Sequence, residues 1–415
     1  MKNEFASLKA YLVGGAVRDE LLGLALADRD YVVIGALPEQ LLQLGFQQVG
    51  KDFPVFLHPQ TKEEYALART ERKSGVGYGG FVCDFGPEVS LEEDLQRRDL
   101  TINAIAKTEQ GDYVDPYGGR RDLAERTLRH VSPAFAEDPL RVLRVARFAA
   151  RFARLGFTVH PSTLALMTEL SSSGELATLT PERVWKETQR ALTEATPSEF
   201  FRVLRACGAL AQLFPELDAL FGVPQAVEHH PEVDSGLHVM LSIDLASQLF
   251  DNAQVSYAVL VHDLGKGVTP QREWPQHIDH ERKGLPLVDA MSQRFKVPKD
   301  YAALGRLVCE HHLRCHRMLE MKPGSVVALL EALDAFRRPE RVALFAAACE
   351  ADARGRKGRA DEAYPQAQLL LDSMAEARQV DVKPLLAKGY RGAELTEPLR
   401  QARISAVATL LNQQR

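Results

Sequence analysis

The first part of the chain, up to about residue 130, alternates short apolar runs with glycines and polar turns. β-branched and aromatic residues are frequent in these runs, and this composition is typical of strands in a sheet. The predicted strands span residues 10–13, 31–34, 53–57 and 80–83. The apolar spacing over residues 37–44 predicts a helix between the second strand and the third.

The pattern changes at about residue 137, where apolar residues begin to recur at intervals of three and four. Such spacing places apolar side chains on one face of a helix, so it predicts that the rest of the chain is mainly helical. The clearest examples are residues 138–154, 181–195 and 198–213. A stretch with Gly and Pro at residues 221–225 interrupts the pattern and predicts a boundary between two helical parts.

These changes predict several consecutive parts in a chain of 415 residues. That length suits roughly two to four domains of ordinary size. We expect an α/β head over 1–136, a helical neck over 137–225, a second helical domain over 228–352 and a helical tail over 353–415. The predicted fold class is therefore α+β.

Composition narrows the class of protein. Apolar residues make up 45 % and charged residues 26 % of the chain, and the net charge is −5. These values exclude a disordered chain and a wholly basic nucleic-acid-binding protein, although a local basic patch remains compatible with them. The five cysteines are scattered without a CxxC pair, which is typical of a reducing compartment. Since no uncharged apolar run approaches the roughly 18 residues of a membrane span, we expect a cytoplasmic protein with no membrane partner.

A turn suited to phosphate follows the first predicted strand, in Gly14-Gly15-Ala-Val-Arg18-Asp19. Paired glycines let a phosphate approach the backbone closely, and the helix N-terminus that follows offers free N–H donors. Arg18 adds a planar guanidinium that matches phosphate oxygens. Taken alone, this turn fits an ordinary strand-to-helix connection equally well.

Two aspartates, Asp28 and Asp30, run directly into the strand predicted over 31–34. If both belong to that strand, their spacing of two places the carboxylates on one face. Paired carboxylates suit Mg²⁺, and two-metal sites hold the reacting oxygens of a phosphoryl transfer. A solvated Asp-Arg-Asp turn is the alternative, but the nearby glycine turn and Arg18 favour a metal site.

A glycine-rich segment at residues 75–80 satisfies the dinucleotide-binding pattern GxGxxG. It precedes a predicted strand instead of a helix, so the structural context of that motif is missing. We interpret the segment as a loop beside the metal site.

Five arginines lie on one face of the helix predicted over 138–154, and no acid interrupts residues 139–154. They are Arg141, Arg144, Arg147, Arg151 and Arg154. A one-sided arginine face indicates an anionic partner, and acidic neighbours within the protein are the alternative. Asp138 and Arg141, three residues apart, together offer an acceptor and a donor fork for the edge of a nucleobase.

As a set, these motifs resemble the class II tRNA nucleotidyltransferases, or CCA-adding enzymes, of the DNA polymerase β superfamily. The resemblance is carried by the glycine turn, Asp28-Arg29-Asp30, Arg97-Arg98-Asp99-Leu-Thr-Ile-Asn103, Glu137–Phe148 and the later helical motif Pro181–Glu187. It covers at least residues 10–215. It implies a polymerase-β-like head followed by an all-α neck and body.

The resemblance also implies roles for individual residues. Asp28 and Asp30 would be catalytic and would bind Mg²⁺. The residues implied to contact the nucleotide are Gly15, Arg18, Arg98, Asp138, Arg141, Arg144 and Arg147. Among them, Asp138 and Arg141 would select CTP or ATP by base edge. The acceptor would be the 3′ end of tRNA, whose hydroxyl attacks the α-phosphate without a nucleic-acid template.

A second group of chemically active residues lies between residues 229 and 316, where most of the 12 histidines are found. The pair His262-Asp263 ends an apolar run, and His238 precedes it by about one helix and a turn. Imidazole and carboxylate together suit divalent transition metals and hydrolysis by metal-bound water. This arrangement resembles the HD superfamily of metal-dependent phosphohydrolases, whose ligand pattern is H…HD…D.

The HD resemblance implies that His238, His262 and Asp263 bind a divalent transition metal such as Ni²⁺, with Asp352 as the final ligand. His262 and Asp263 would be the catalytic pair. His277 and His280 resemble the extra histidines of the longer HD pattern.

An HD domain behind a CCA-adding head is the arrangement of the multifunctional enzymes of many proteobacteria. The resemblance implies addition of C, C and A to tRNA from CTP and ATP, together with 2′,3′-cyclic phosphodiesterase, 2′-nucleotidase and phosphatase activities. We expect a monomer or a homodimer. A bacterial poly(A) polymerase is one alternative, but its basic C-terminal extension is not matched by the mixed charges of residues 381–415. An HD nucleotide hydrolase with a degenerate head is another, which the intact Asp28 and Asp30 disfavour.

Overall fold

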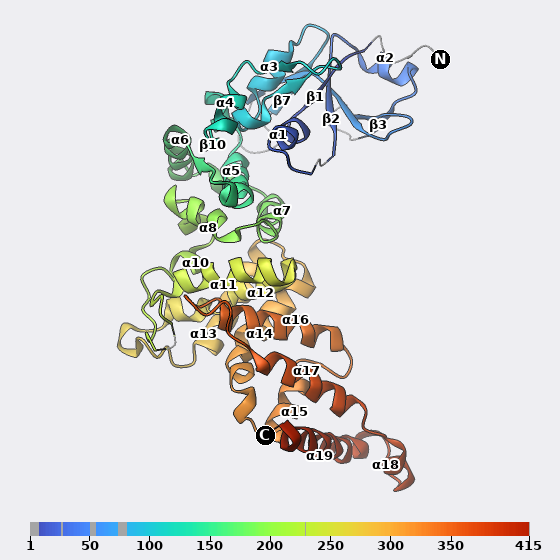
Figure 1. Ribbon diagram of the computed structural model, residues 1–415, viewed down its shortest axis with the longest axis vertical. Coiled ribbons are helices and arrows are strands. Elements are labelled where there is room, and N and C mark those ends of the chain that lie inside the picture. The colour runs from blue at the N-terminus through green and yellow to red at the C-terminus, as the bar shows by residue number, and fades with distance from the viewer. Residues whose placement is uncertain (1–7, 26–27, 50–54, 74–80, 229, 415) are drawn as a thin grey trace. The chain divides into compact units, whose positions relative to one another are not determined.

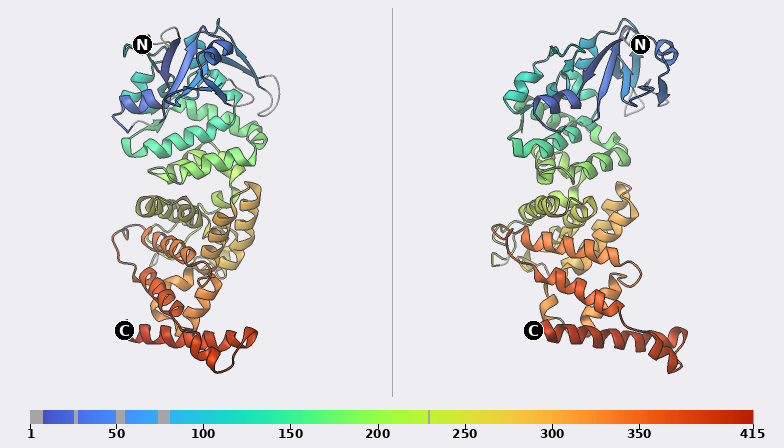
Figure 2. Two further views of the ribbon diagram at one scale, coloured as in Figure 1. Left: turned by 90° about the vertical axis from the view of Figure 1, so that its right-hand side faces the viewer. Right: turned by 45° about the vertical axis from the view of Figure 1, so that its right-hand side comes forward.

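The chain divides into two compact units, which are described separately. The computed structural model describes residues 8–25, 28–49, 55–73, 81–228 and 230–414. The first unit comprises Met1–Val184 and Arg202–Leu213, and the second comprises Trp185–Phe201 and Phe214–Arg415. Within the described residues, every named strand belongs to the first unit, and the second unit is helical (Figures 1 and 2).

The head is built on a mixed sheet in which β2 has a central place. Among the described residues the strand order is β3-β4-β5-β2-β1-β8-β9. The strands are β1 (Lys9–Val13), β2 (Asp30–Ile34), β3 (Gln47–Val49), β4 (Val55–Leu57), β5 (Glu64–Leu67), β8 (Ala106–Lys107) and β9 (Tyr113–Val114). β2 pairs with β1 in antiparallel and with β5 in parallel orientation. The strands expected over 10–13 and 31–34 are therefore confirmed.

The other two expected strands are also found, with different partners. β4 is the end of the strand expected over 53–57, whose first two residues lie outside the described part of the chain. The strand expected over 80–83 is β7 (Phe81–Phe85), which pairs with β6 (Arg69–Lys73) in a separate hairpin. The glycine-rich segment 75–80 lies outside the described residues.

β2 contributes buried residues to both faces of the sheet, since successive residues of a strand point to opposite sides. The helices of the head are α1 (Gly15–Leu21), α2 (Pro38–Gln43), α3 (Leu91–Gln96) and α4 (Gly119–Ala124). Val32 of β2 belongs to one core with Leu95 of α3, whereas Val33 belongs to a second core with Leu41 of α2. The two cores fix the face of β2 and thereby the position of Asp30 at its start.

Helices follow the head, as the apolar spacing predicts. They are α5 (Leu140–Phe152), α6 (Pro161–Ser172), α7 (Pro181–Ala191), α8 (Pro197–Ala206) and α9 (Ala209–Leu213). The single helix expected over 198–213 is wrong, because α8 and α9 are separate. Gly208 between them has φ +78°, a left-handed conformation that ends a helix.

The second unit continues with helices up to residue 414. They are α10 (Pro215–Asp218), α11 (Ser235–Phe250), α12 (Ala253–Val261), α13 (His280–Arg294), α14 (Lys299–His316), α15 (Pro323–Ala332), α16 (Pro339–Arg354), α17 (Pro365–Arg378), α18 (Lys383–Ala387) and α19 (Thr396–Gln414). α12 lies at the centre, where it contacts α11, α14 and α16. All of its residues from Val255 to Val261 are buried, so the residues that follow it emerge in the interior of the unit.

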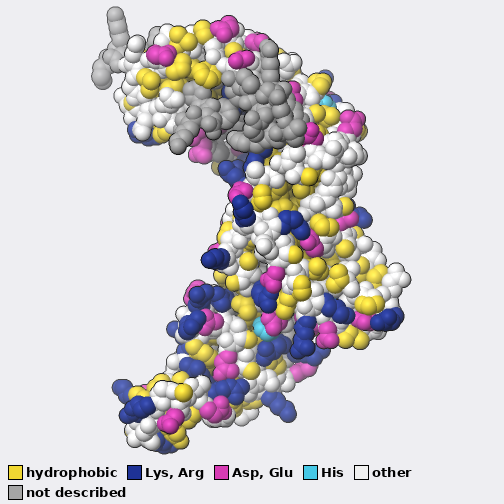
Figure 3. All heavy atoms as spheres, turned by 180° about the vertical axis from the view of Figure 1, so that it is seen from behind, with side chains coloured by type: hydrophobic (Ala, Val, Ile, Leu, Met, Phe, Trp, Pro, Cys, Tyr) yellow, Lys and Arg dark blue, Asp and Glu magenta, His cyan; other side chains and the backbone are white. Residues whose placement is uncertain are grey.

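Basic and acidic side chains are mixed on the part of the surface that Figure 3 shows. On the face drawn in Figure 3, Lys and Arg side chains are interspersed with Asp and Glu along the helical part of the chain. Among the helices that the structure describes, none combines the length and the apolar character needed to cross a membrane.

Candidate functional site

The glycine turn of the head brings an arginine from another segment against the backbone. Gly14 has φ +70° and ψ −127°, which glycine adopts more readily than other residues. A Cβ atom at this position would lie 3.0 Å from Nη1 of Arg98. Arg98 is held there by Asp94, whose Oδ2 lies 3.2 Å from Nη2. The turn and Arg98 therefore come together as the predicted nucleotide site requires, on residues more than 80 positions apart.

Arg18 lies beneath the turn, largely buried. Its Nε donates to Asp19 Oδ1 at 2.8 Å, and its Nη1 donates to Asn103 Oδ1 at 2.6 Å. The guanidinium also lies over the ring of Phe148, with a distance of 5.2 Å to the centroid. Burial lowers the pKa of Arg18, and Asp19 partly opposes this effect. The structure thus shows Arg18 joining the turn to α5, while its contact with a nucleotide stays a prediction.

Three carboxylates gather where β2 begins. Asp30 is the first residue of β2, Asp28 lies two residues before it, and both side chains are exposed. Glu64 of β5 is the register partner of Asp30 in the parallel pair. Partial loss of hydration, followed by the charges of Glu64 and Asp28, raises the pKa of Asp30, and Arg98 opposes the rise. Such a concentration of carboxylate oxygens suits a hard divalent cation.

Glu64 was not among the predicted site residues. Its proximity to Asp30 depends on the pairing of β2 with β5, which skips over β3 and β4. No local pattern in the sequence predicts that pairing. Only the register of the sheet places Glu64 beside Asp30.

The arginine face of α5 meets acids within the protein. Nη2 of Arg144 lies 2.7 Å from Asp99 Oδ2, and Nη2 of Arg151 lies 2.9 Å from Asp19 Oδ2. Arg147 is largely buried, with its guanidinium 4.6 Å from the ring centroid of Phe148. For Arg144 and Arg151, the alternative of acidic neighbours inside the protein is thus what the structure shows. Their proposed support of a nucleotide would have to act alongside these ion pairs.

Asp138 lies just before α5 and Arg141 lies in its first turn, and each of the two side chains has partners of its own within the protein. Asp138 Oδ1 accepts a hydrogen bond from the Leu140 backbone N–H at 3.0 Å. Its Oδ2 lies 3.0 Å from Nη2 of Arg183, a residue that lies in the predicted motif Pro181–Glu187 but had no predicted role. Arg141 donates to the backbone oxygens of Ala134 and Arg97, at 2.7 and 2.6 Å. These bonds fix both side chains at the entrance of α5 in one orientation.

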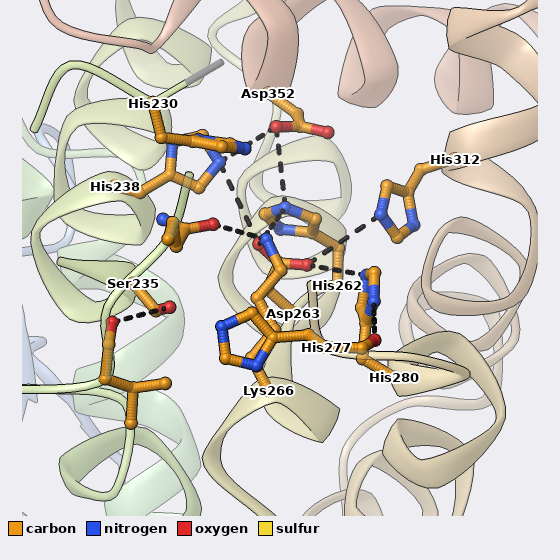
Figure 4. A network of polar contacts seen from close by, with 12 residues as sticks. His230, Ser235, His238, His262, Asp263, Lys266, His277, His280, His312 and Asp352 are labelled. Atoms are coloured by element: carbon orange, nitrogen blue, oxygen red, sulfur yellow. Dashed lines mark hydrogen bonds and ion pairs between the residues drawn. The ribbon is translucent and has the colours of Figure 1, made fainter. Parts of the chain in front are cut away.

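The second unit brings together all of the residues predicted for the HD metal site. The four residues come from three separate places in the helical framework (Figure 4). His238 lies in the first turn of α11, His262 and Asp263 directly follow α12, and Asp352 lies in the last turn of α16. All four side chains are almost completely buried.

Each of the two predicted carboxylates lies close to Nε2 of both predicted histidines. Asp352 Oδ1 lies 2.9 Å from Nε2 of His238 and 3.5 Å from Nε2 of His262. Asp263 Oδ2 lies 3.2 Å from Nε2 of His262 and 3.9 Å from Nε2 of His238. Asp352, the final ligand that the HD resemblance implies, therefore lies beside both histidines although it is far from them along the chain. Nitrogen and carboxylate ligands at these separations fit a divalent transition metal.

The charges within this group explain its need for a cation. Burial alone would lower the pKa of His262, but Asp263 and Asp352 outweigh burial and raise it to about 10. In turn, His262 is the largest favourable influence that holds the pKa of each aspartate well below its usual range, against the effect of burial. Two buried carboxylates thus require positive charge nearby, and a bound divalent cation can replace the histidine proton.

Several neighbours of this group were not predicted as ligands. Nε2 of His280 lies 3.3 Å and Nε2 of His312 lies 3.8 Å from the other oxygen of Asp263, Oδ1. Lys266 Nζ donates to Asp263 Oδ2 and to Gln225 Oε1. His280 was noted in the sequence as an extra histidine, whereas His312 belongs to the cluster of histidines between residues 229 and 316 and is buried in α14.

His277, the other extra histidine, has a different place. Its Nδ1 is hydrogen-bonded to Thr269 Oγ1 at 2.6 Å, and its Nε2 donates to the Pro224 carbonyl oxygen at 2.8 Å. Both ring nitrogens are therefore used within the protein. The two histidines that resemble the longer HD pattern therefore differ in their contacts, since of the two only His280 has a ring nitrogen close to Asp263.

Three known protein families match consecutive parts of the chain. The Poly A polymerase head domain matches residues 10–129, the probable RNA and SrmB-binding site of polymerase A matches residues 156–221, and the HD domain matches residues 236–353. The glycine turn, Asp28, Asp30 and Arg98 fall in the first match. His238, His262, Asp263 and Asp352 fall in the third.

Relatives that match almost the whole chain are named multifunctional CCA proteins. The multifunctional CCA protein of Hahella chejuensis is 58 % identical over 400 residues, which cover 96 % of this chain and 95 % of that one. The multifunctional CCA protein of Ectopseudomonas mendocina is 60 % identical over 400 residues, or 96 % and 98 % of the two chains. A solved apo structure of a CCA-adding enzyme shares the fold, with a TM-score of 0.65, 20 % identity and coverage of 98 % of this chain and 92 % of that one. Because identity near 60 % extends over almost the full length, this chain belongs to the multifunctional CCA protein family.

Proposed function

We propose that the head of this protein adds C, C and A to the 3′ end of tRNA, using CTP and ATP as donors. The observation that carries the proposal is the cluster of Asp28, Asp30 and Glu64 at the start of β2, inside the matched polymerase head. The names of the relatives support tRNA and the CCA sequence as the acceptor and product. Poly(A) synthesis is the alternative activity, and sequencing of the reaction products distinguishes it from CCA addition.

In this reaction the terminal ribose hydroxyl of tRNA attacks the α-phosphorus, and the bond from that phosphorus to pyrophosphate breaks. Asp28 and Asp30 would hold Mg²⁺, which supplies charge neutralisation for the phosphate oxygens when bound. Gly15 lets the triphosphate approach the backbone, and Arg98 brings a guanidinium to the same turn. These residues bind and orient the donor, which is the main contribution of a protein to phosphoryl transfer.

Selection of the nucleobase is assigned to Asp138 and Arg141. Their distances to Arg183, Ala134 and Arg97 define one orientation before any nucleotide is bound. A base that pairs with both a carboxylate and a guanidinium edge would be accepted, while one with the wrong donor pattern would leave a polar group unpaired. Arg144 and Arg147 would support this pair from the next turn of α5.

The HD site is proposed to hydrolyse phosphoesters, including 2′,3′-cyclic phosphates, 2′-nucleotides and phosphomonoesters. His238, His262, Asp263 and Asp352 would hold a divalent transition metal such as Ni²⁺. When bound, such a metal supplies a nucleophilic water at neutral pH. Lys266, whose Nζ donates to Asp263 Oδ2, keeps that carboxylate ionised and oriented.

Two substitutions separate the two activities. Asp30→Asn should abolish addition of nucleotides to tRNA that lacks its 3′ end while leaving hydrolysis of 2′,3′-cyclic AMP intact, and Asp263→Asn should do the reverse. Asp112→Asn, a change of the same chemistry in an exposed turn of the head, is the matched control and should retain both activities. The products of the CTP and ATP reaction are sequenced. Addition of a run of A, or use of ATP alone on any RNA, would contradict the proposed CCA addition.

A further inference from the structure

The turn between α16 and α17 carries an arginine with an unused buried donor. Nε of Arg356 is buried and has no hydrogen-bond partner among the described residues. The neighbouring arginines are bonded, since Nη2 of Arg354 donates to the Ala360 carbonyl oxygen at 2.6 Å and Nη2 of Arg359 donates to the Glu228 carbonyl oxygen at 3.2 Å. A guanidinium stays charged at any ordinary pH, so a buried N–H without an acceptor is costly. An anionic ligand at Arg356 would remove this cost.

Arg356 lies one helical turn beyond Asp352. Asp352 belongs to the last turn of α16, and Gly355 directly after the helix keeps a right-handed helical conformation, with φ −70° and ψ −3°. Positions four residues apart on a helix share one face and are separated by about 6 Å along the axis. Asp352 contacts His238 and His262. The continuation of α16 therefore places Arg356 on the side that faces the HD site.

Close backbone packing holds this end of α16 against α11. A Cβ atom at Gly355 would lie 2.5 Å from the Cα atom of Ser242. Ser242 lies one turn after His238 in α11. Only a residue without a side chain allows so close an approach. The contact thus fixes the residue before Arg356 against the helix that carries a predicted metal ligand.

The residue after Arg356 is tied to the other side of the same histidine. The Lys357 backbone N–H donates to Glu232 Oε2 at 3.1 Å. The second oxygen, Glu232 Oε1, lies 3.0 Å from Nδ1 of His238 and 3.1 Å from Nδ1 of His230. Both chain neighbours of Arg356 are therefore anchored to the surroundings of His238.

Electrostatics place the charge of Arg356 beside this part of the site. Burial lowers the pKa of His230 to about 4, and the charge of Arg356 contributes to the lowering. The His230 ring packs on the His238 ring, with centroids 4.6 Å apart (Figure 4). Lys266, another cation whose charge affects His230, already donates to Asp263 Oδ2. Arg356 thus brings to the site a positive charge with a donor that still needs an acceptor.

We propose that Arg356 binds the phosphate oxygens of the substrate at the HD site. Its ligand is the phosphate group of a phosphomonoester or of a 2′,3′-cyclic phosphate, because a planar guanidinium matches two oxygens of such a group. The inference rests on the proposed hydrolytic function and deepens it by naming a residue, outside the metal ligands, that holds the reacting phosphate and offsets its negative charge.

Binding of a ligand that cannot be hydrolysed tests the proposal apart from activity. Phenylphosphonate, a stable analogue of a phosphomonoester, is titrated calorimetrically into full-length, Co²⁺-loaded protein carrying Asp30→Asn, which removes a head carboxylate. Adding Arg356→Ala should raise the Kd by about 10-fold or more, because a charged hydrogen bond is lost, and Arg356→Lys should raise it less. Lys357→Met, which removes the exposed neighbouring cation, is the matched control and should leave the Kd unchanged. Bound Co²⁺ per chain should be the same in all four proteins.

Two further measurements separate phosphate binding from a structural role. Arg356→Ala should raise KM for 2′,3′-cyclic AMP, and added guanidinium ion should partly restore both KM and the affinity for phenylphosphonate. In the unsubstituted protein, phenylphosphonate should slow hydrogen exchange over residues 353–364, a result that depends on no variant.

An unchanged Kd in Arg356→Ala, or unchanged exchange over this segment in the unsubstituted protein, would overturn the proposal. If phenylphosphonate binding depends on Arg356 but the unsubstituted protein does not hydrolyse 2′,3′-cyclic AMP, the phosphate site stands and the hydrolytic function fails.

Discussion

Oδ1 of Asp352 lies 2.9 Å from Nε2 of His238, although 114 residues separate the two along the chain. The contact exists because α11 and α16 pack against each other around α12. His316 Nε2 holds the other oxygen of Asp352 at 2.7 Å, so the carboxylate is fixed on both sides. This relationship makes Asp352 the residue on which the HD assignment can be tested most sharply.

Asp352→Asn should lower hydrolysis of 2′,3′-cyclic AMP by on the order of 100-fold or more, because it replaces a charged metal ligand with a neutral amide. Addition of nucleotides to tRNA should be unchanged. Steady-state hydrolysis and tRNA extension are measured on the same preparation. Asp361→Asn, an exposed change seven residues from the end of α16, is the control and should have no effect on either reaction. Wild-type hydrolysis by Asp352→Asn would remove this residue from the site.

Glu232→Gln should weaken metal binding at the HD site by about 10–100-fold, because Glu232 orients His238 from the side away from the metal. A positioning role predicts that excess metal restores hydrolysis, which loss of a direct ligand would not allow. The measurement is the concentration of Ni²⁺ or Co²⁺ that gives half-maximal hydrolysis. Glu228→Gln, an exposed change in the same segment, should leave that concentration unaltered. An unaltered value in Glu232→Gln would show that His238 needs no such support.

Gly14→Ala should impair nucleotide addition by raising KM for both CTP and ATP. The new Cβ atom would lie 3.0 Å from Arg98 Nη1 and would add strain at φ +70° of about 1–3 kcal/mol. Gly23→Ala separates the two effects, since Gly23 has φ +67° and no atom within 4 Å of the added Cβ position. Kinetics of tRNA extension at varied CTP and ATP provide the comparison. Equal KM values in the two variants would mean that strain, and not displacement of Arg98, explains the loss.

Asp99→Asn should destabilise the head at neutral pH but not in acid. Although burial opposes ionisation, Arg144 and Asn103 hold the pKa of Asp99 below its ordinary value. A lowered pKa in the folded state stabilises the fold above the unfolded pKa of about 3.9, and this contribution is lost as pH falls through the folded pKa. We expect a difference of about 1–3 kcal/mol at pH 7 that shrinks below pH 4.

Hydrogen exchange of the peptide Leu100–Ala106, corrected for the intrinsic effect of pH, measures this difference across a series from neutral to acid pH. The control is again Asp112→Asn, which lies in an exposed turn. A stability difference that is constant with pH would show that Asp99 acts through packing and not through its charge.

The contacts of Arg144 in the head depend on tertiary packing as well as on helix periodicity. The periodicity of α5 correctly placed the arginines on one face of a helix, since 100° per residue fixes that face. It could not decide what the face meets. Asp99 and Asp19 come from the loop after α3 and from α1, and only the packing of these elements on α5 brought their carboxylates to Arg144 and Arg151.

In the HD site, too, the tertiary structure distinguishes two histidines that the sequence pattern does not. The sequence treats His277 and His280 alike, as two members of an extended pattern. In the structure one is bonded on both nitrogens to Thr269 and Pro224, while the other aims an unpaired nitrogen at Asp263. The difference arises from how the segment between η7 (Leu264–Val268) and α13 folds back on itself, which no local spacing encodes.

By itself, the sequence determined the order of the parts and the α+β class, and it pointed to most of the candidate site residues. These features depend on local periodicity and on motifs whose members lie within a few residues of one another. Only the tertiary structure decided that Glu64 lies beside Asp30, that Asp352 reaches His238, and that His312 faces the far oxygen of Asp263. Such contacts join segments tens to hundreds of residues apart, and they depend on strand register and helix packing, which arise from the burial of many side chains at once.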